Sequence, residues 1–249
     1  MTTIKDKLHF KYNGKSTSEF GVWSVTLDGG MFEETLVASQ NIREESLVDR
    51  RVSIFSGLEK EPISFELVLA FENGFTDKLI EDVVEWLYGT EYYSKLEFED
   101  SNKVYYCMPN GQSTITHTGQ QEGYITLEMR TNSPFVFGKM ESKTGTTQIT
   151  IDRKGKIDPE SIIKIKSKSD GSVKLKMNDY TVQINNLLKD ETVTIYPSEE
   201  DIESDRDNVY HYNDYIGDLS KLGLIDKTNI LSIDGDVEVE YSYQPYYNK

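Results

Sequence analysis

The feature that most constrains the fold is an alternation of apolar and polar side chains with a period of two residues. Between Pro62 and Glu72 the side chain at every odd position from Ile63 to Phe71 is apolar. Period two places alternate side chains on opposite faces of a β-strand. The same alternation recurs in both halves of the chain, at Leu96 and Phe98, at Ile125, Leu127 and Met129, at Val173, Leu175 and Met177, at Tyr180, Val182 and Ile184, and at Val237, Val239 and Tyr241. Short strands of this kind between turn residues predict a mainly β chain built from β-sandwiches.

One segment has helical periodicity instead. After Asn73-Gly74, Thr76 is suited to cap a helix, and Gly89 is suited to end it. Apolar residues between them recur at helical spacing and form a wide stripe, namely Leu79, Ile80, Val83, Val84, Trp86 and Leu87. We therefore expect a single helix that lies across a sheet.

A change of pattern divides the chain into two predicted domains. Alternation stops at Ser133-Pro134 and Gly138, and a new series of strands is expected after the Ser/Thr/Gly-rich stretch 141–147. We place the domains at 1–138 and 139–249, with net charges of −10 and −6. Charge is unevenly spread in the second domain, because 153–176 holds eight basic residues whereas 190–218 holds ten acidic residues and one arginine.

The overall charge argues against two classes of partner. The chain has 43 Asp and Glu residues against 27 Lys and Arg residues, for a net charge of −16. This sign disfavours binding to nucleic-acid backbones and to anionic membranes. The sequence has neither the apolar core of a signal peptide at its start nor a run of membrane-spanning length, and its single cysteine cannot form an intramolecular disulfide. We expect folding in a reducing cytoplasm and no membrane partner.

No group of residues predicts a catalytic, cofactor-binding or metal site. His9, His117 and His211 lack the spacing of a metal pair and are expected to be structural or surface residues. Cys107 lies in an apolar strand-like run and is interpreted as a buried, unreactive thiol. The sequence has neither a nucleophile elbow nor a phosphate-binding glycine loop.

The acidic residues and the tyrosines of the chain each allow more than one interpretation. Acidic pairs are too frequent for composition to exclude a glycosidase, and the run 198–207 is interpreted as a solvated loop in preference to a calcium site. The chain has 16 tyrosines, several of them in 241–247. These could stack on sugars or anchor an interface, or they could form a final strand with Tyr241 and Tyr243 pointing inward.

Several stretches taken together resemble the distal tail protein (Dit) family of long-tailed, siphovirus-type phages. In the first domain they are Leu8–Val22, Lys60–Phe65, the helix end Glu85-Trp-Leu87, Leu96–Asp100 and Gly123–Pro134; in the second they are Asn186–Val193, Asn213–Leu219 and Asn229–Asp236. The resemblance covers nearly the whole chain.

This resemblance implies a structural virion protein at the distal end of the tail, made in the cytoplasm of a bacterial host. The family forms a six-membered ring between the tail tube and the central hub, which carries a spike or tail-associated lysin. The implied ring-forming first domain is a β-sandwich with one packed helix, and its intersubunit arm corresponds to 31–57. In that arm we assign Arg43, Arg50, Arg51 and Phe55 to the subunit interface.

The implied second domain is an outer, galectin-like sandwich that docks receptor-binding proteins or side fibres. DNA would pass through an acidic or neutral lumen without specific binding. The alternative is a host cell-wall carbohydrate-binding module on the outer domain, and a glycosidase comes third. No enzyme activity, cofactor or metal is expected.

Overall fold

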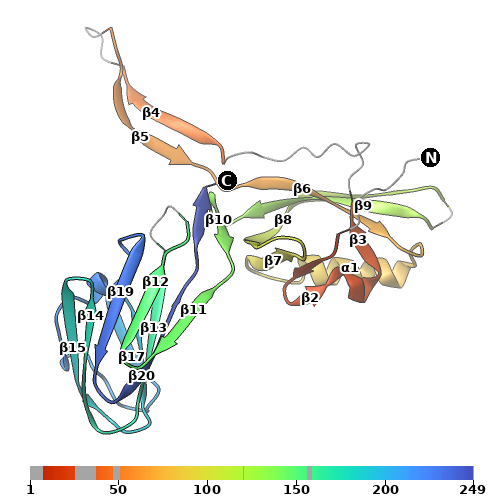
Figure 1. The fold of residues 1–249 in the computed structure, drawn as a ribbon. Coiled ribbons are helices and arrows are strands. Elements are labelled where there is room, and N and C mark those ends of the chain that lie inside the picture. Colours follow the sequence, from red (N-terminus) through yellow and green to blue (C-terminus); the bar gives the residue numbers. More distant parts are fainter. Residues whose placement is uncertain (1–7, 26–37, 47–50, 120, 156–158, 249) are drawn as a thin grey trace. The chain divides into compact units, whose positions relative to one another are not determined.

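A computed structural model describes residues 8–25, 38–46, 51–119, 121–155 and 159–248. The chain divides into two compact units, one up to Phe137 and one spanning Gly138–Tyr247. The described residues are mainly β-strand with one α-helix, as the alternation predicted (Figure 1). No helix among them is long and apolar enough to cross a membrane.

The first unit is a sheet with one helix against it. Its main path has the order β2-β1-β7-β8-β9-β6-β3, and β10 pairs with β8 beside that path. The strands are β1 (Phe10–Tyr12), β2 (Lys15–Ser16), β3 (Val22–Ser24), β6 (Ser64–Phe71), β7 (Ser94–Phe98), β8 (Lys103–His117), β9 (Gly123–Thr131) and β10 (Phe135–Gly138), and a short 3-10 helix, η1, spans Thr17–Phe20. These strands belong to one connected sheet. The mainly β unit with one packed helix is the one that the sequence predicted, and the helix contributes Val83, Trp86 and Leu87 to the core.

The helix α1 (Asp77–Tyr88) is the one that the sequence predicted. The Thr76 hydroxyl accepts a hydrogen bond from the backbone N–H of Leu79 at 3.2 Å, and Gly89 follows the last turn. Val83, Trp86 and Leu87 are buried in the first core. Val84, which we placed in the apolar stripe, is exposed, because it lies on the flank of the face that Val83 and Leu87 present.

A buried tryptophan joins this helix to the sheet. The indole Nε1 of Trp86 donates a hydrogen bond to the backbone carbonyl of Tyr12 in β1 at 2.9 Å. The Trp86 ring also stacks on Phe20, with centroids 4.6 Å apart. Cys107 of β8 lies in the same core and is fully buried, and burial raises the pKa of its thiol to about 12. The interpretation of Cys107 as a buried core residue is confirmed, and its low reactivity stays a prediction.

The second unit is a sandwich of two five-stranded sheets (Figure 1). One sheet has the order β11-β20-β13-β16-β17 and the other β12-β19-β14-β15-β18. The first comprises β11 (Glu141–Gly145), β20 (Val237–Tyr243), β13 (Ser161–Ser167), β16 (Thr192–Tyr196) and β17 (Asp201–Ser204). The second comprises β12 (Gln148–Asp152), β19 (Thr228–Asp234), β14 (Gly171–Met177), β15 (Tyr180–Leu187) and β18 (Tyr215–Ile216), and the 3-10 helix η2 (Leu219–Leu222) precedes β19. The short strand β21 (Tyr246–Asn248) instead pairs with β10.

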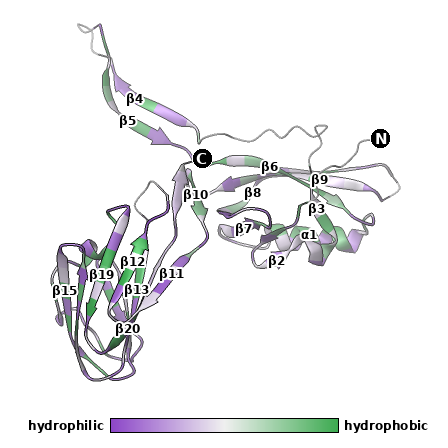
Figure 2. Ribbon diagram, in the orientation of Figure 1, coloured by the Kyte–Doolittle hydropathy of each residue, from purple (hydrophilic) through white to green (hydrophobic). Residues whose placement is uncertain are grey.

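The core of the second unit follows the period-two pattern closely. Strands such as β14 and β20 alternate between buried apolar and more accessible polar residues along their length, which gives the alternating colours of Figure 2. Tyr241 and Tyr243 point inward, as predicted for a final strand.

Two local predictions in the second unit were wrong. The Ser/Thr/Gly-rich stretch was expected to precede the strands, yet Glu141–Gly145 is itself strand β11 and pairs with β20. The acidic run 198–207 contains strand β17, with Ile202 buried, and is not simply a solvated loop. In both cases pairing with another strand, the distant β20 for β11 and the preceding β16 for β17, satisfies the backbone of a segment whose own composition favours a loop.

Candidate functional site

A two-stranded hairpin in the first unit is the strongest candidate for a subunit interface. Strands β4 (Gln40–Glu45) and β5 (Ile54–Lys60) pair with each other and with no further strand among the described residues. Two strands without a packed face are marginal in water. Among the described residues the hairpin is thus a candidate for packing against a partner surface.

A β-bulge gives this hairpin one apolar face. Ile42 lies opposite Leu58, and the register then shifts so that Glu44 lies opposite Phe55. Residues directly opposite each other share a face, so Ile42, Leu58 and Phe55 are on the same side, together with Glu44. Gly57 at the bulge has a φ of 151°, a conformation that glycine adopts without strain.

The apolar face is open to solvent in the single chain. The exposed fractions of Ile42, Phe55 and Leu58 are 65%, 62% and 55%. None of the three joins either hydrophobic core of the described residues. Three large apolar side chains together on an unpacked strand pair form a surface of the kind that marks an interaction site.

The opposite face of the hairpin carries polar side chains that pair with each other and one exposed apolar side chain, Ile54, which lies opposite Glu45. The Arg43 guanidinium donates to the Glu59 carboxylate at 2.6 and 3.0 Å, and the Asn41 amide donates to the Glu61 carboxylate at 2.6 Å. These side chains are exposed, so their contribution to stability is small. They leave the apolar face as the part of the hairpin that gains from being covered.

The structure places three of the four predicted interface residues. Arg43 and Phe55 lie on opposite faces of the hairpin, and Arg51 is exposed just before β5; Arg50 lies outside the described residues. The sequence analysis missed Ile42 and Leu58, which complete the face around Phe55. The apolar character of Ile42 and Leu58 is visible in the sequence. Phe55 and Leu58 are three positions apart, however, and period-two alternation would place them on opposite faces of a strand.

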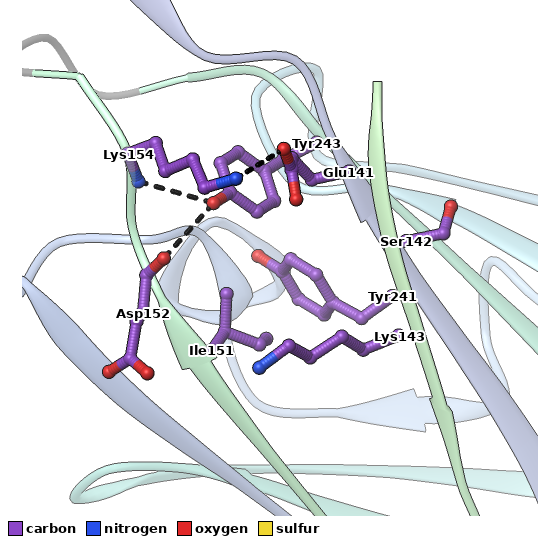
Figure 3. A pocket seen from close by; sticks show the side chains of 8 residues that line it. All are labelled: Glu141, Ser142, Lys143, Ile151, Asp152, Lys154, Tyr241 and Tyr243. Carbon is purple, nitrogen blue, oxygen red and sulfur yellow. Dashed lines mark hydrogen bonds and ion pairs between the residues drawn. The ribbon is translucent and has the colours of Figure 1, made fainter. Parts of the chain in front are cut away.

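The second unit has a pocket of about 250 Å³ between the ends of its two sheets (Figure 3). The backbone carbonyl of Asp152 accepts a hydrogen bond from the Tyr243 hydroxyl at 3.2 Å, and the Lys154 ammonium pairs with Glu141 at 2.7 Å. The Lys143 ammonium donates to the backbone carbonyl of Thr150 at 2.6 Å. Most polar groups that line the pocket are thus engaged within the protein, and the buried Tyr241 and Tyr243 rings offer no open face to a sugar.

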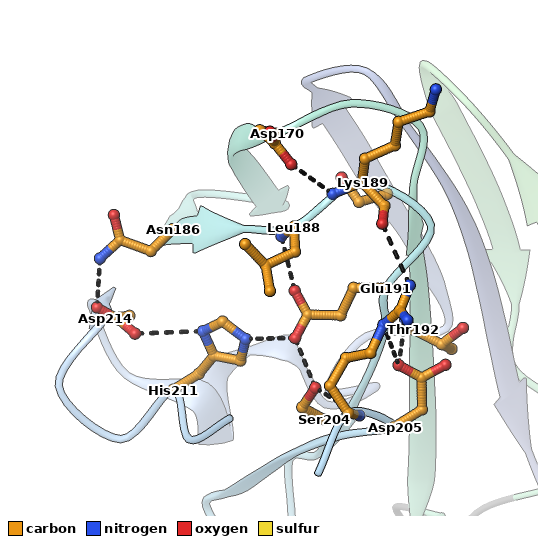
Figure 4. Close-up of polar contacts among 12 residues, drawn as sticks. Asp170, Asn186, Leu188, Lys189, Glu191, Thr192, Ser204, Asp205, His211 and Asp214 are labelled. Carbon is orange, nitrogen blue, oxygen red and sulfur yellow. Dashed lines mark hydrogen bonds and ion pairs between the residues drawn. The ribbon is translucent and has the colours of Figure 1, made fainter. Parts of the chain in front are cut away.

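A buried acid–histidine pair is the most unusual polar feature of the second unit (Figure 4). Glu191 is fully buried and accepts hydrogen bonds from the backbone N–H of Leu188 at 2.7 Å, the Ser204 hydroxyl at 2.5 Å and Nε2 of His211 at 2.8 Å. Nδ1 of His211 lies 3.3 Å from the Asp214 carboxylate, close enough for an ion pair although not aligned as a hydrogen bond.

This pair has a structural rather than a catalytic geometry. Burial raises the pKa of Glu191, but the hydrogen bonds from Leu188, Ser204 and His211 outweigh burial, so the pKa lies below its ordinary value. An acid that accepts hydrogen bonds from three donors in its ionised form anchors its surroundings. His211 is thus a structural residue, as the sequence analysis expected.

The other histidines also have local roles. Nδ1 of His9 lies 2.8 Å from the Thr17 hydroxyl, and its ring stacks on Trp23. His117 is exposed at the end of β8 and accepts a hydrogen bond from the backbone N–H of Gly119. Among the described residues no group of three or more His, Cys, Asp or Glu side chains is placed to hold a metal ion.

Solved structures with the same fold come from a phage hub adsorption apparatus and a phage baseplate. The crystal structure of the Dit protein of phage SPP1, described as a paradigm of the hub adsorption apparatus in phages that infect Gram-positive bacteria, matches with a TM-score of 0.68 and 11% identity over 95% of this chain and 98% of that one. A chain of the phage P2 baseplate in its activated conformation matches with a TM-score of 0.51 and 8% identity, over 97% of this chain and 98% of that one. The fold is that of a phage distal tail protein.

The sequence itself establishes the family. Residues 5–133 match the model of a phage tail protein N-terminal domain, and residues 140–243 match that of a phage tail C-terminal domain. The chain therefore belongs to the phage tail proteins that these two models describe. It is also 23% identical, over 68% of its length and 69% of the relative's, to YomH, an uncharacterised protein derived from the SPbeta prophage of Bacillus subtilis strain 168.

Proposed function

We propose that this tail-tip protein forms a hexameric ring that joins the tail tube to the central hub or spike. In this proposal domain 1–138 makes the ring, and the hairpin of each subunit lays its apolar face on the neighbouring subunit. Domain 139–249 is the outer galectin-like sandwich, a docking platform for receptor-binding proteins or side fibres. We assign the chain no catalytic activity.

The exposed apolar face of the hairpin is the observation that carries the proposal. Full burial of one large apolar side chain contributes roughly 1.5–3 kcal/mol. The three side chains retain between 55% and 65% of their exposure, so covering them would contribute about 3–5 kcal/mol per hairpin. In a closed ring every subunit covers one hairpin and has its own hairpin covered, which leaves no such face open.

Light scattering and electron micrographs of the purified full chain test the ring. We expect a particle of six subunits for the wild-type chain, and monomers for a Phe55→Asn, Leu58→Asn double variant whose circular dichroism is unchanged. Tyr92→Asn is the matched control, because Tyr92 is an exposed large side chain of the same unit that lies away from the hairpin; this variant should still form rings. A monomeric wild-type chain at high concentration would contradict the proposal, as would intact rings of the double variant.

The charge of the first domain supports passage of DNA without binding. Domain 1–138 carries a net charge of −10, and an acidic or neutral channel wall would not retain a phosphate backbone. Tight DNA binding that weakens steeply with salt would argue against such a channel.

Carbohydrate binding by the second domain receives no comparable support. Its pocket is smaller than typical ligand sites, and its polar groups are largely engaged within the protein. We therefore assign the outer domain to protein docking.

A further inference from the structure

Two neighbouring tyrosines of the second unit are displayed on its surface. The exposed fractions of Tyr210 and Tyr212 are 69% and 58%, and their rings lie nearly parallel, 14° apart, with centroids separated by 6.4 Å. Exposed tyrosines supply large contact area at low entropic cost and are enriched in protein interfaces. A pair held in parallel is a stronger signal than a single exposed ring.

The buried pair described above holds these tyrosines outward. His211, the residue between them, is 1% exposed and is fixed between Glu191 and Asp214 (Figure 4). The backbone N–H of Asp214 also donates to the carbonyl of His211 at 3.0 Å. Because the middle residue is anchored in the interior, its two neighbours are presented to solvent in a fixed place. Preorganisation of this kind lowers the cost of binding.

Carboxylates of the adjacent strand border the tyrosine pair. In β17 the buried Ile202 separates Asp201 and Glu203, which therefore share the outer side of the strand. The charge of Asp201 is the first cause of a raised pKa for the Tyr212 phenol, and Glu203 adds to it, which places both acids close to that hydroxyl. The Tyr196 hydroxyl donates to Glu203 at 3.4 Å.

The chemistry of this surface fits a cationic side chain. The Tyr196 phenol donates to Glu203 and the Tyr212 phenol is influenced by the charge of Asp201, so the surface offers a ligand mainly ring faces and carboxylate lone pairs. A neutral sugar would need donors from the site as well, whereas a guanidinium brings its own donors and also stacks on aromatic faces. The surrounding run 190–218 has ten acidic residues and the single basic residue Arg206, which pairs with Asp205 and so leaves the surface acidic.

We propose that the surface formed by Tyr210, Tyr212, Asp201 and Glu203, called here the tyrosine surface, binds a protein partner through arginine or lysine side chains of that partner. This inference rests on the docking role proposed for the outer domain and names the chemistry of what docks there. The tyrosine rings provide contact area and cation–π attraction, and the carboxylates provide charge and hydrogen-bond acceptors.

Fluorescence anisotropy of the full chain with a labelled peptide of alternating arginine and glycine tests this proposal at physiological salt. The Tyr210→Ala, Tyr212→Ala double variant keeps the net charge of the protein and should lower affinity by about tenfold, since cation–π contacts contribute roughly 0.5–2 kcal/mol each. Tyr180→Ala is the matched control: Tyr180 is 50% exposed in the same unit, and its replacement should leave affinity unchanged. The Tyr210→Phe, Tyr212→Phe variant keeps both ring faces and should bind the peptide.

Several results would overturn the proposal. Equal affinity of the wild-type chain and the double alanine variant would show that net charge alone attracts the peptide. An equal loss of affinity in Tyr180→Ala would show that the effect is not specific to Tyr210 and Tyr212. Tyrosine-dependent binding to neutral saccharides on a glycan array, without peptide binding, would make the surface a sugar site.

Light scattering of the same variants separates this proposal from the proposed ring. If the double alanine variant loses peptide binding but still forms rings, the result supports the tyrosine surface and does not affect the proposal of a ring. A wild-type chain that binds the peptide but remains monomeric would contradict the ring alone.

Discussion

Replacing Glu191 with glutamine should destabilise the second unit selectively. The carboxylate accepts from Leu188, Ser204 and His211 inside the protein. A glutamine amide has one oxygen, and its NH2 group would face at least one of these donors. A buried donor left unpaired costs about 1–3 kcal/mol, and breaking a buried charged pair costs about 3–5 kcal/mol. We expect a loss of about 2–4 kcal/mol.

Hydrogen exchange measured by mass spectrometry gives the local readout. A loss of about 2–4 kcal/mol corresponds to exchange that is roughly 30- to 700-fold faster at the Leu188 amide and in segment 205–214. Both tryptophans of the chain, Trp23 and Trp86, lie in the first unit, so their fluorescence should stay the same. Glu238→Gln is the control, because Glu238 is an exposed carboxylate on β20 of the same unit.

The pH dependence follows from the lowered pKa of Glu191. A carboxylate whose pKa is lower in the folded state stabilises the fold above its ordinary value of 4.5, and this contribution is lost as the pH falls through the folded pKa. The difference in stability between the wild-type chain and Glu191→Gln should therefore be constant from neutral pH down to about 4.5 and shrink below it. Exchange rates within twofold of wild type, or an equal effect of Glu238→Gln, would refute the anchoring role of Glu191.

Three further outcomes are expected. Trp86→Phe leaves the Tyr12 carbonyl without its buried donor and should cost the first unit about 1–3 kcal/mol in chemical denaturation, whereas Tyr92→Phe should cost little. The Cys107 thiol, with a pKa of about 12 and no exposed surface, should react with a thiol reagent in denaturant and not in the folded chain; fast labelling of the native protein would contradict its burial. Residues 1–138 and 139–249, expressed separately, should each unfold cooperatively by circular dichroism, and a fragment without a transition would argue against two independent domains.

The sequence was most informative where one local signal decides the structure. Helix α1 was predicted with its cap and end, because Thr76, the apolar stripe and Gly89 all lie within one short segment. Alternation likewise predicted the buried faces of β14 and β20. Each of these signals depends on residues a few positions apart.

Features that depend on distant pairing were not predictable in this way. Phe55 and Leu58 share a face although three positions separate them, because the bulge at Gly57 shifts the strand out of period two. Glu191 and His211 are 20 residues apart, and nothing near either one indicates the other. Whether the strands of the first unit form one sheet or two is likewise decided by their partners and not by their composition.

The pairing order of the second unit has a kinetic consequence. The first two strands of the sandwich, β11 and β12, pair with its last two, β20 and β19, so that Glu141 lies opposite Tyr243. Such long loops must close before the core gains from burial, and proteins rich in distant contacts fold in roughly milliseconds to seconds. Until β19 and β20 arrive, β11 and β12 are unpaired edges that can join another chain. When many copies of the chain are present, this sandwich is completed slowly enough for chains to pair wrongly with one another. This is therefore the step at which misassembly between chains competes with the growth of a tail.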